Sequence, residues 1–223
     1  FTDIAGIVKG ASRGEGLGNK FLSHIRQVDA ICQVVRCFED ENITHVAGKV
    51  DPIADIETIN LELVLADLES VDKRIARVAK IAKTKDKDAV AELAVLEKIK
   101  PVLEDGQLAR TIEFTDEELP IVKGLFLLTT KPMLYIANIS EDDVAEGGHN
   151  QYVQLVEEYA AKEDAEVVVI CARVEEEVAE LEEEEKQVFL EEMGIETSGL
   201  DILIQKAYHL LGLATYFTAG EQE

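Results

Sequence analysis

The hydrophobic positions of this 223-residue chain follow two kinds of pattern. Three short apolar runs, rich in Val or Ile and bounded by polar or turn residues, have the character of buried strands. Segments with helical periodicity lie between and after them, which predicts an α/β fold with a parallel sheet covered on both faces. The strand runs are AICQVVRCF, PMLYIANI and AEVVVICA, and the helical segments are GNKFLSHIRQ, HNQYVQLVEEYAAKE, the Glu-rich stretch after Arg173 and GLDILIQKAYHLLGLA.

Residues 55 to about 105 break this alternation and predict an antiparallel helical hairpin, closed by KTKDKD. Two ordinary core helices are the alternative, and the charged flanks of the segment favour a partly exposed hairpin. Apolar residues three and four positions apart form a coiled-coil seam with one slip in register, followed by a second stripe. The first seam comprises Leu61, Leu65, Leu68, Val71, Ile75, Val78 and Ala82, and the second comprises Val90, Leu93, Leu96, Ile99 and Leu103.

The charge and the cysteine content of the chain limit the ligands, partners and cellular compartment that we expect for it. The net charge of −24 disfavours direct binding of naked nucleic acid, including sequence-specific DNA binding, but permits a nucleoprotein partner. No run of 18 apolar residues exists, so a membrane partner is not expected. The three cysteines form no CxxC pair, which is typical of buried thiols in a reducing cytoplasm. The Glu-rich stretch predicts a solvated helix face with Val178, Leu181, Val188 and Leu190 turned inward.

The opening words DIAG fit the pattern D-x-x-G at a strand end. In phosphate-binding α/β domains the Asp holds Mg²⁺, usually through a water, and the Gly brings its N–H close to a terminal phosphate. Asp3 and Gly6 take these roles here. The glycine-rich segment after DIAG would allow the chain to become ordered around a phosphate. Alternatively, it is a simple surface loop.

Two later motifs lie at predicted strand ends. Asn138 ends the second strand run with Glu141 three residues on, and a carboxamide offers both donors and an acceptor to a purine edge. The backbone of Cys171 and Ala172, in ICARV, would line the same base pocket. Each motif alone is weak, since Asn in an acidic turn is common after strands. Their order along one sheet edge is that of nucleotide-binding motifs in GTPase-type P-loop proteins.

Four segments of the sequence match a known family: DIAGIVKGASRGEGLGNKFLSHIR, VVRCFEDENITHVAGKVDPIADIE, LTTKPMLYIANISEDD and GLDILIQKAYHLLGLATYFTAGE. In these segments the chain resembles the Obg-like ATPase (YchF) family of translation-factor-class P-loop NTPases. The resemblance implies a GTPase-like nucleotide-binding domain at residues 1–54 and 130–223, with a helical hairpin inserted at 55–129. It also implies a phosphate-binding G-x-x-x-x-G-K-[ST] loop and a C-terminal TGS domain. Neither is found in these residues, so we expect an internal fragment that is inactive alone.

The resemblance refines the site. Ile7 follows Gly6 where Ras-like GTPases place a water-orienting Gln, so His45 is the candidate for that role, with a structural histidine as the alternative. N-x-x-E replaces N-K-x-D, which predicts ATP over GTP, with Asn138 and the backbone of Ile139 on adenine. Phe38 either stacks on the base or is a core aromatic.

Two functions remain in competition. The first is a cytoplasmic, Mg²⁺-dependent ATP (or GTP) hydrolase that acts as a switch on the ribosome. The second is a non-catalytic helical interaction module, favoured by the lack of a phosphate loop in these residues.

Overall fold

The computed structural model describes residues 1–4, 17–40 and 48–217, and the chain divides into two compact units. The first unit contains residues 1–31 and 54–132, and the second contains residues 32–53 and 133–223. Among the described residues, no helix combines the length and the apolar character needed to cross a bilayer.

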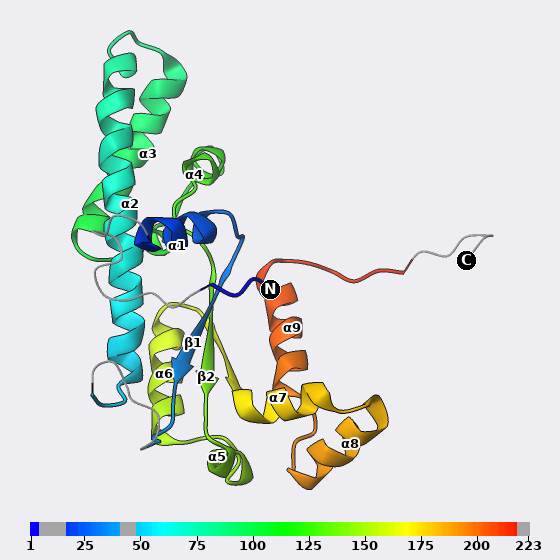
Figure 1. Cartoon of the computed structure of the whole chain (residues 1–223). Helices are drawn as coiled ribbons and strands as arrows, with labels where there is room; N and C mark the ends of the chain where they lie inside the picture. Colours follow the sequence, from blue (N-terminus) through cyan, green and yellow to red (C-terminus); the bar gives the residue numbers. More distant parts are fainter. Residues whose placement is uncertain (5–16, 41–47, 218–223) are drawn as a thin grey trace, which may run out of the picture. The chain divides into compact units, whose positions relative to one another are not determined.

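The first unit is helical. Its longest elements form the predicted pair, in which α2 and α3 run side by side and are joined by a short turn (Figure 1). The 31 residues of α2 make it about 46 Å long at 1.5 Å per residue. The elements are α1 (Leu17–Arg26), α2 (Pro52–Ala82), α3 (Lys87–Glu104), the 3₁₀ helix η2 (Ala109–Thr111) and α4 (Leu119–Leu125).

The seam between α2 and α3 is more regular than the sequence predicts. Leu61 was expected to begin it but is 47% exposed, and Val90 of the second stripe is 49% exposed, so both assignments are wrong. Val64 is buried in place of Leu61 at the start of the seam. The apolar positions of α2 then alternate between steps of four and three residues, so the predicted slip in register is absent. The stripe consists of Val64, Leu68, Val71, Ile75, Val78 and Ala82, and it packs with Ala89, Leu93, Val95, Leu96, Ile99 and Leu103 of α3.

The predicted turn lies between Ala82 and Lys87. Lys85 adopts a left-handed backbone conformation (φ 64°), which reverses the chain. Asp86 then caps α3, since its side chain accepts a hydrogen bond of 2.8 Å from the amide of Ala89. KTKDKD therefore closes the hairpin, as its polar composition indicates.

A buried carboxylate fixes α2 within the first unit. Asp67 has no exposed side-chain surface, and its oxygens accept hydrogen bonds from the amides of Leu128 (3.0 Å) and Thr129 (2.7 Å) and from the Thr129 hydroxyl (2.7 Å). Arg26 of α1 lies 3.4 Å away and also donates to Ser70 Oγ at 3.0 Å. Burial raises the pKa of the Asp67 carboxyl, although these hydrogen bonds and the arginine charge act in the opposite direction.

The second unit is built on a three-stranded sheet in the order β1-β2-β3. Strands β2 and β3 are parallel, with Leu134 opposite Glu166 and Asn138 opposite Ile170. The amide of Cys37, just past β1, donates to the carbonyl of Asn138 at 2.8 Å. The elements are β1 (Ile31–Arg36, whose first residue groups with the first unit), β2 (Met133–Asn138), α5 (Glu141–Ala145), α6 (Gln151–Lys162), β3 (Glu166–Ile170), α7 (Ala172–Glu180), α8 (Glu183–Glu192) and α9 (Gly199–Leu210).

Helices cover both faces of this sheet, which confirms the α/β expectation (Figure 1). Leu134 and Ile136 share a core with Leu203 of α9. The side chain of Tyr135 alternates to the other face, where its ring meets that of Tyr159 of α6 edge to face at 6.1 Å. Residues 133–137 of β2 are all buried, so the strand is a run without polar alternation.

The Glu-rich stretch forms two helices rather than one solvated face. Helix α7 ends at Glu180 and α8 begins at Glu183, with the extended residue Leu181 between them. Val178 and Leu190 are buried as predicted, whereas Val188 is 56% exposed, so its inward assignment is wrong.

We expect Asp67→Ala to lower the free energy of unfolding by about 3 kcal/mol, because two buried amides and a hydroxyl lose their acceptor. Urea denaturation followed by circular dichroism measures this. Asp72→Ala is the matched control, since Asp72 pairs with Lys100 on an exposed face and its loss should cost less than about 1 kcal/mol. Equal losses in the two variants would contradict the role given to Asp67.

Candidate nucleotide-binding site

The predicted site residues fall in different parts of the chain. Asp3 is exposed and belongs to the first unit. Gly6 and His45 lie outside the described residues. The predicted base-binding residues all belong to the second unit, which makes their mutual geometry describable: Phe38, Asn138, Ile139, Cys171 and Ala172.

Asn138 connects the ends of all three strands. Its carbonyl accepts from Cys37, and its side-chain Oδ1 accepts a 2.9 Å hydrogen bond from the amide of Ala172, the first residue of α7. The next amide, that of Ile139, donates to the carbonyl of Ile170 at 2.9 Å. The strand ends that the sequence assigned to one base pocket are therefore joined by direct hydrogen bonds.

These bonds change which groups are available to a base. The amides of Ile139 and Ala172 already donate within the protein, so any part they take in lining a pocket comes from other atoms. The Oδ1 of Asn138 is likewise engaged, while the described residues supply no acceptor for its Nδ2. The free donor of Asn138 is the group best placed for an acceptor on a purine ring.

Glu141 is the last residue of the N-x-x-E motif, which the sequence analysis expects in place of N-K-x-D. It begins α5, and its Oε1 pairs with Arg173 Nε at 3.0 Å. Ser140 caps the same helix and forms a capping box with Asp143. The Glu141 carboxylate is thus held toward a guanidinium of α7, which competes with its use as a double acceptor for guanine.

Phe38 has one ring face covered within its own unit. The Arg36 guanidinium carbon lies 4.7 Å from the ring centre, and Arg36 Nε donates to the Phe38 carbonyl at 3.0 Å. The half-buried ring is therefore neither a core aromatic nor a fully open platform. A base stacked on Phe38 would use the opposite face.

Two residues that hold the strand ends and helix starts in place were not predicted from the sequence. Asn150 Nδ2 donates to the carbonyl of Cys37 at 2.7 Å, while its Oδ1 caps α6 by accepting from the amides of Tyr152 and Val153. An Asn just before an apolar helical stripe is a capping signal visible in the sequence. Burial raises the pKa of the adjacent Cys37 to about 12, which keeps that thiol protonated and unreactive near neutral pH.

The second such residue is Glu175 of α7. Its carboxylate accepts from the Ser198 hydroxyl (3.1 Å) and from the amides of Gly199 (2.6 Å) and Leu200 (3.2 Å), so it holds the start of α9. Gly199 packs directly on β3, where a Cβ atom would lie 2.5 Å from Ile170 Cγ2. The end of β3 therefore requires glycine at this position.

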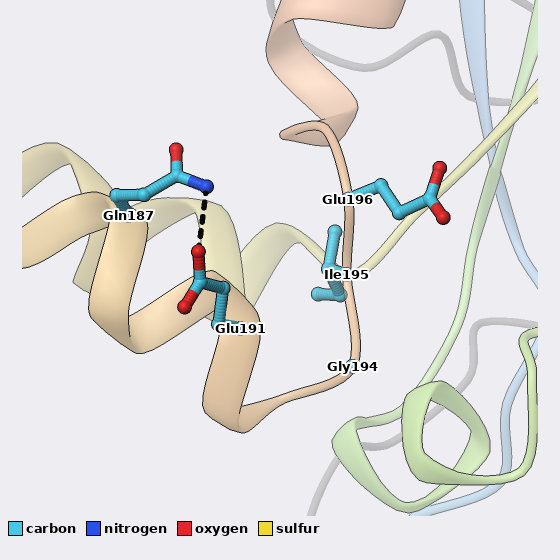
Figure 2. Close-up of a pocket in the computed structure, with 5 residues that line it drawn as sticks. All are labelled: Gln187, Glu191, Gly194, Ile195 and Glu196. Carbon is cyan, nitrogen blue, oxygen red and sulfur yellow. Dashed lines mark hydrogen bonds between the residues drawn. The ribbon is translucent and has the colours of Figure 1, made fainter.

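A hollow elsewhere in the second unit does not involve these residues. Gln187 and Glu191 of α8 and the segment Gly194–Glu196 line it, and Gln187 Nε2 donates to Glu191 Oε1 at 3.1 Å (Figure 2). Its two carboxylates disfavour a phosphate ligand. Within the described ranges, no cluster of three His, Cys, Asp or Glu side chains is arranged to hold a metal ion.

Comparisons of the sequence with curated proteins and of the fold with solved structures both give YchF proteins. No family model matches the sequence. The chain is 69% identical over 223 residues to the ribosome-binding ATPase YchF of Bacillus subtilis and 42% identical over 226 residues to that of Mycoplasma genitalium. These alignments cover 100% of this chain but 61% of each relative. The solved structure of the Schizosaccharomyces pombe YchF GTPase superposes with a TM-score of 0.82 at 37% identity, over 96% of this chain and 58% of that one.

Gly199→Ala tests the packing at the end of β3. We expect it to lower the free energy of unfolding by about 1–3 kcal/mol, because the new methyl group overlaps Ile170. Gly124→Ala in α4 is the matched control, since a Cβ there meets no atom within 4 Å and alanine favours the helix. Chemical denaturation of both variants measures the difference. A Gly199 variant as stable as the Gly124 variant would contradict the close approach.

Proposed function

Because the chain belongs to the YchF family of Obg-like ATPases, we propose that it supplies the nucleotide-binding core of an Mg²⁺-dependent ATP-hydrolysing switch that associates with the ribosome. The observation that carries this proposal is the identity with proteins named ribosome-binding ATPases, which extends over all 223 residues. The chain spans 61% of the length of those relatives.

The proposed domain division follows the family: residues 1–54 and 130–223 for nucleotide binding, and 55–129 as the inserted hairpin. The non-catalytic module considered from the sequence receives no support from relatives that are named for ATPase activity. A cytoplasmic location accords with the ribosome-binding names of the bacterial proteins.

The base end of the site is proposed at Asn138. Its free Nδ2 would donate to adenine, while Ile139, Cys171 and Ala172 shape the pocket around it. The pairing of one Glu141 oxygen with Arg173 supports a preference for ATP over GTP, since guanine would compete with the guanidinium for that oxygen. One relative is named an ATPase and another a GTPase, so both nucleotides belong in the test.

The phosphate end is proposed at Asp3 and Gly6. A carboxylate oxygen suits Mg²⁺, which usually keeps several waters and takes only one or two protein carboxylates. Bound Mg²⁺ would neutralise charge on the phosphate oxygens. Gly6 would present its N–H to the terminal phosphate, and His45 would orient the attacking water in place of the glutamine that Ile7 replaces.

Asn138→Ala and Asn138→Asp separate base recognition from structure. Both variants lose the Nδ2 donor, so we expect the Kd for fluorescent ATP in the full-length protein to rise by about 5- to 150-fold, equivalent to about 1–3 kcal/mol. Asn138→Asp keeps an acceptor for the Ala172 amide and should unfold at a higher urea concentration than Asn138→Ala. The ATP-to-GTP affinity ratio of the wild-type protein, measured alongside, should exceed one.

Asn150→Asp is the control for Asn138→Asp. It makes the same chemical change next to the same strand end, yet it removes only a contact with the Cys37 carbonyl, so ATP affinity should stay within about threefold of wild type. Unchanged ATP affinity in Asn138→Asp would rule out the base-reading role.

His45→Ala tests the water-orienting role. We expect kcat for ATP hydrolysis to fall by about 10²- to 10⁴-fold while ATP affinity changes little, because His45 would act in the chemical step. Single-turnover hydrolysis and equilibrium titration give the two quantities. His149→Ala is the control, since that histidine is exposed and sits beside Glu157. Full turnover in His45→Ala would transfer the role to another group.

A further inference from the structure

The segment that follows β1 is held in place by hydrogen bonds to two neighbouring elements. We call residues 37–40 the β1 exit. The carbonyl of Cys37 accepts a 2.7 Å hydrogen bond from Asn150 Nδ2, and the Tyr152 hydroxyl donates to the carboxylate two residues farther along. The amide of Cys37 donates to the carbonyl of Asn138 at 2.8 Å. The backbone of the β1 exit is therefore fixed relative to the start of α6 and the end of β2.

Arg36, the last residue of β1, folds over the same segment. Its Nε donates to the carbonyl of Phe38 at 3.0 Å, and its Nη2 donates to the carbonyl of Asp40 at 3.4 Å. Its guanidinium carbon lies 4.7 Å from the centre of the Phe38 ring. One side chain thus holds both the backbone that carries Phe38 and one face of the ring.

A guanidinium is suited to hold a ring and its backbone together. It is planar, so it stacks on an aromatic face while its N–H groups donate to carbonyl oxygens. A lysine ammonium carries the same charge as a point and offers no plane to stack. A half-buried phenyl ring at a strand end otherwise exchanges between rotamers, and fixing one of them on binding costs free energy. Arg36 therefore orients the Phe38 ring before any ligand arrives.

Phe38 lies at the same sheet edge as Asn138, the residue proposed to read the base. The connection between them is short, because the Cys37 amide bonds directly to the Asn138 carbonyl and Phe38 is the next residue. Arg36 covers one face of the half-buried ring, so a stacked base would use the opposite face. Stacking on an aromatic face holds any base, whereas a carboxamide donor fixes the orientation of that base. The two side chains would thus supply complementary parts of base recognition.

We propose that Arg36 is a positioning residue for the nucleotide, which holds the Phe38 ring in the orientation on which the purine base stacks. This inference rests on the proposed function and adds a residue to the base end of its site. Arg36 acts through the ring and makes no contact with the base. A general attraction of the Arg36 charge for phosphates is a different role, because it would affect any polyphosphate and would survive replacement by lysine.

The test uses the full-length protein with Arg36→Lys, with Phe38→Leu and with both substitutions together. Isothermal titration calorimetry in the presence of Mg²⁺ measures the Kd for ATP and the Kd for inorganic tripolyphosphate, which has no base. We expect each single variant to raise the Kd for ATP by about fivefold or more, and to leave the Kd for tripolyphosphate within about twofold of wild type. The stoichiometry of each titration gives the folded fraction separately, because a loss of folded protein lowers the stoichiometry without raising the Kd.

The double variant decides whether Arg36 acts through Phe38. If it does, adding Arg36→Lys to Phe38→Leu should change the Kd for ATP by less than about twofold, because the ring that Arg36 positions is already absent. Effects of the two substitutions that multiply would overturn the proposal, since Arg36 would then act independently of the ring. An equal loss of ATP and tripolyphosphate affinity in Arg36→Lys would also overturn it.

Arg77→Lys is the matched control. It makes the same substitution at an exposed arginine of α2, so the Kd for ATP should stay within about twofold of wild type. Wild-type ATP affinity in Arg36→Lys would overturn the role of Arg36 and leave the proposed function standing. A wild-type protein that binds no ATP would instead refute the proposed function, and this inference with it.

Discussion

The second unit depends on the hydrogen bonds that Asn138 makes at the end of the central strand. Its carbonyl holds the chain leaving β1, and its side chain holds the first turn of α7. The preceding residues of β2 are buried on both faces, so Asn138 is where this strand first reaches solvent. A polar side chain is needed at that point, because the Ala172 amide belongs to a helix terminus with no side-chain cap of its own. The same residue therefore stabilises the sheet edge and presents a donor beyond it, and removal of the whole side chain alters both.

The first unit solves a different problem, which is how to anchor a long helical pair. Asp67 places a desolvated carboxylate on α2 against the amides of the segment that leads toward β2. The cost of burying that charge is offset only while all its donors are present, so the network tolerates little displacement. Farther along α2 the contacts become a plain heptad seam, and at the turn the side chains are exposed and cationic. The hairpin thus passes from a specific polar anchor to an apolar heptad seam, and then to exposed side chains that form no ion pair with the residues described in its own unit.

The sequence predicts these elements to different degrees for identifiable reasons. The three strands and the hairpin follow from periodicity, because runs such as MLYIAN and the heptad steps from Leu68 to Ala82 fit few other patterns. The start of the seam cannot be predicted in this way, because several registers satisfy the pattern there. Four apolar residues lie within five positions: Leu61, Leu63, Val64 and Leu65. The break between α7 and α8 at Leu181 cannot be recognised in the sequence, because the residues around it are strong helix formers and include no Gly or Pro. Asp67 looks like one more charge on an exposed helix until partners 61 and 62 residues away are known. In the site, strand ends place Asn138 and Ala172 on one edge, but the bond between them and the capping roles of Asn150 and Glu175 require coordinates.

The acidic character of the chain constrains the proposed nucleotide ligand. A net charge of −24 repels a nucleoside triphosphate, so the nucleotide is not drawn in by the field of the whole protein. For the nucleotide, the proposed answer is local: Mg²⁺ neutralises the phosphates and short-range donors such as the Asn138 carboxamide define the base, and such contacts are weakly screened by salt. Nucleotide affinity should therefore depend on local geometry more than on ionic strength.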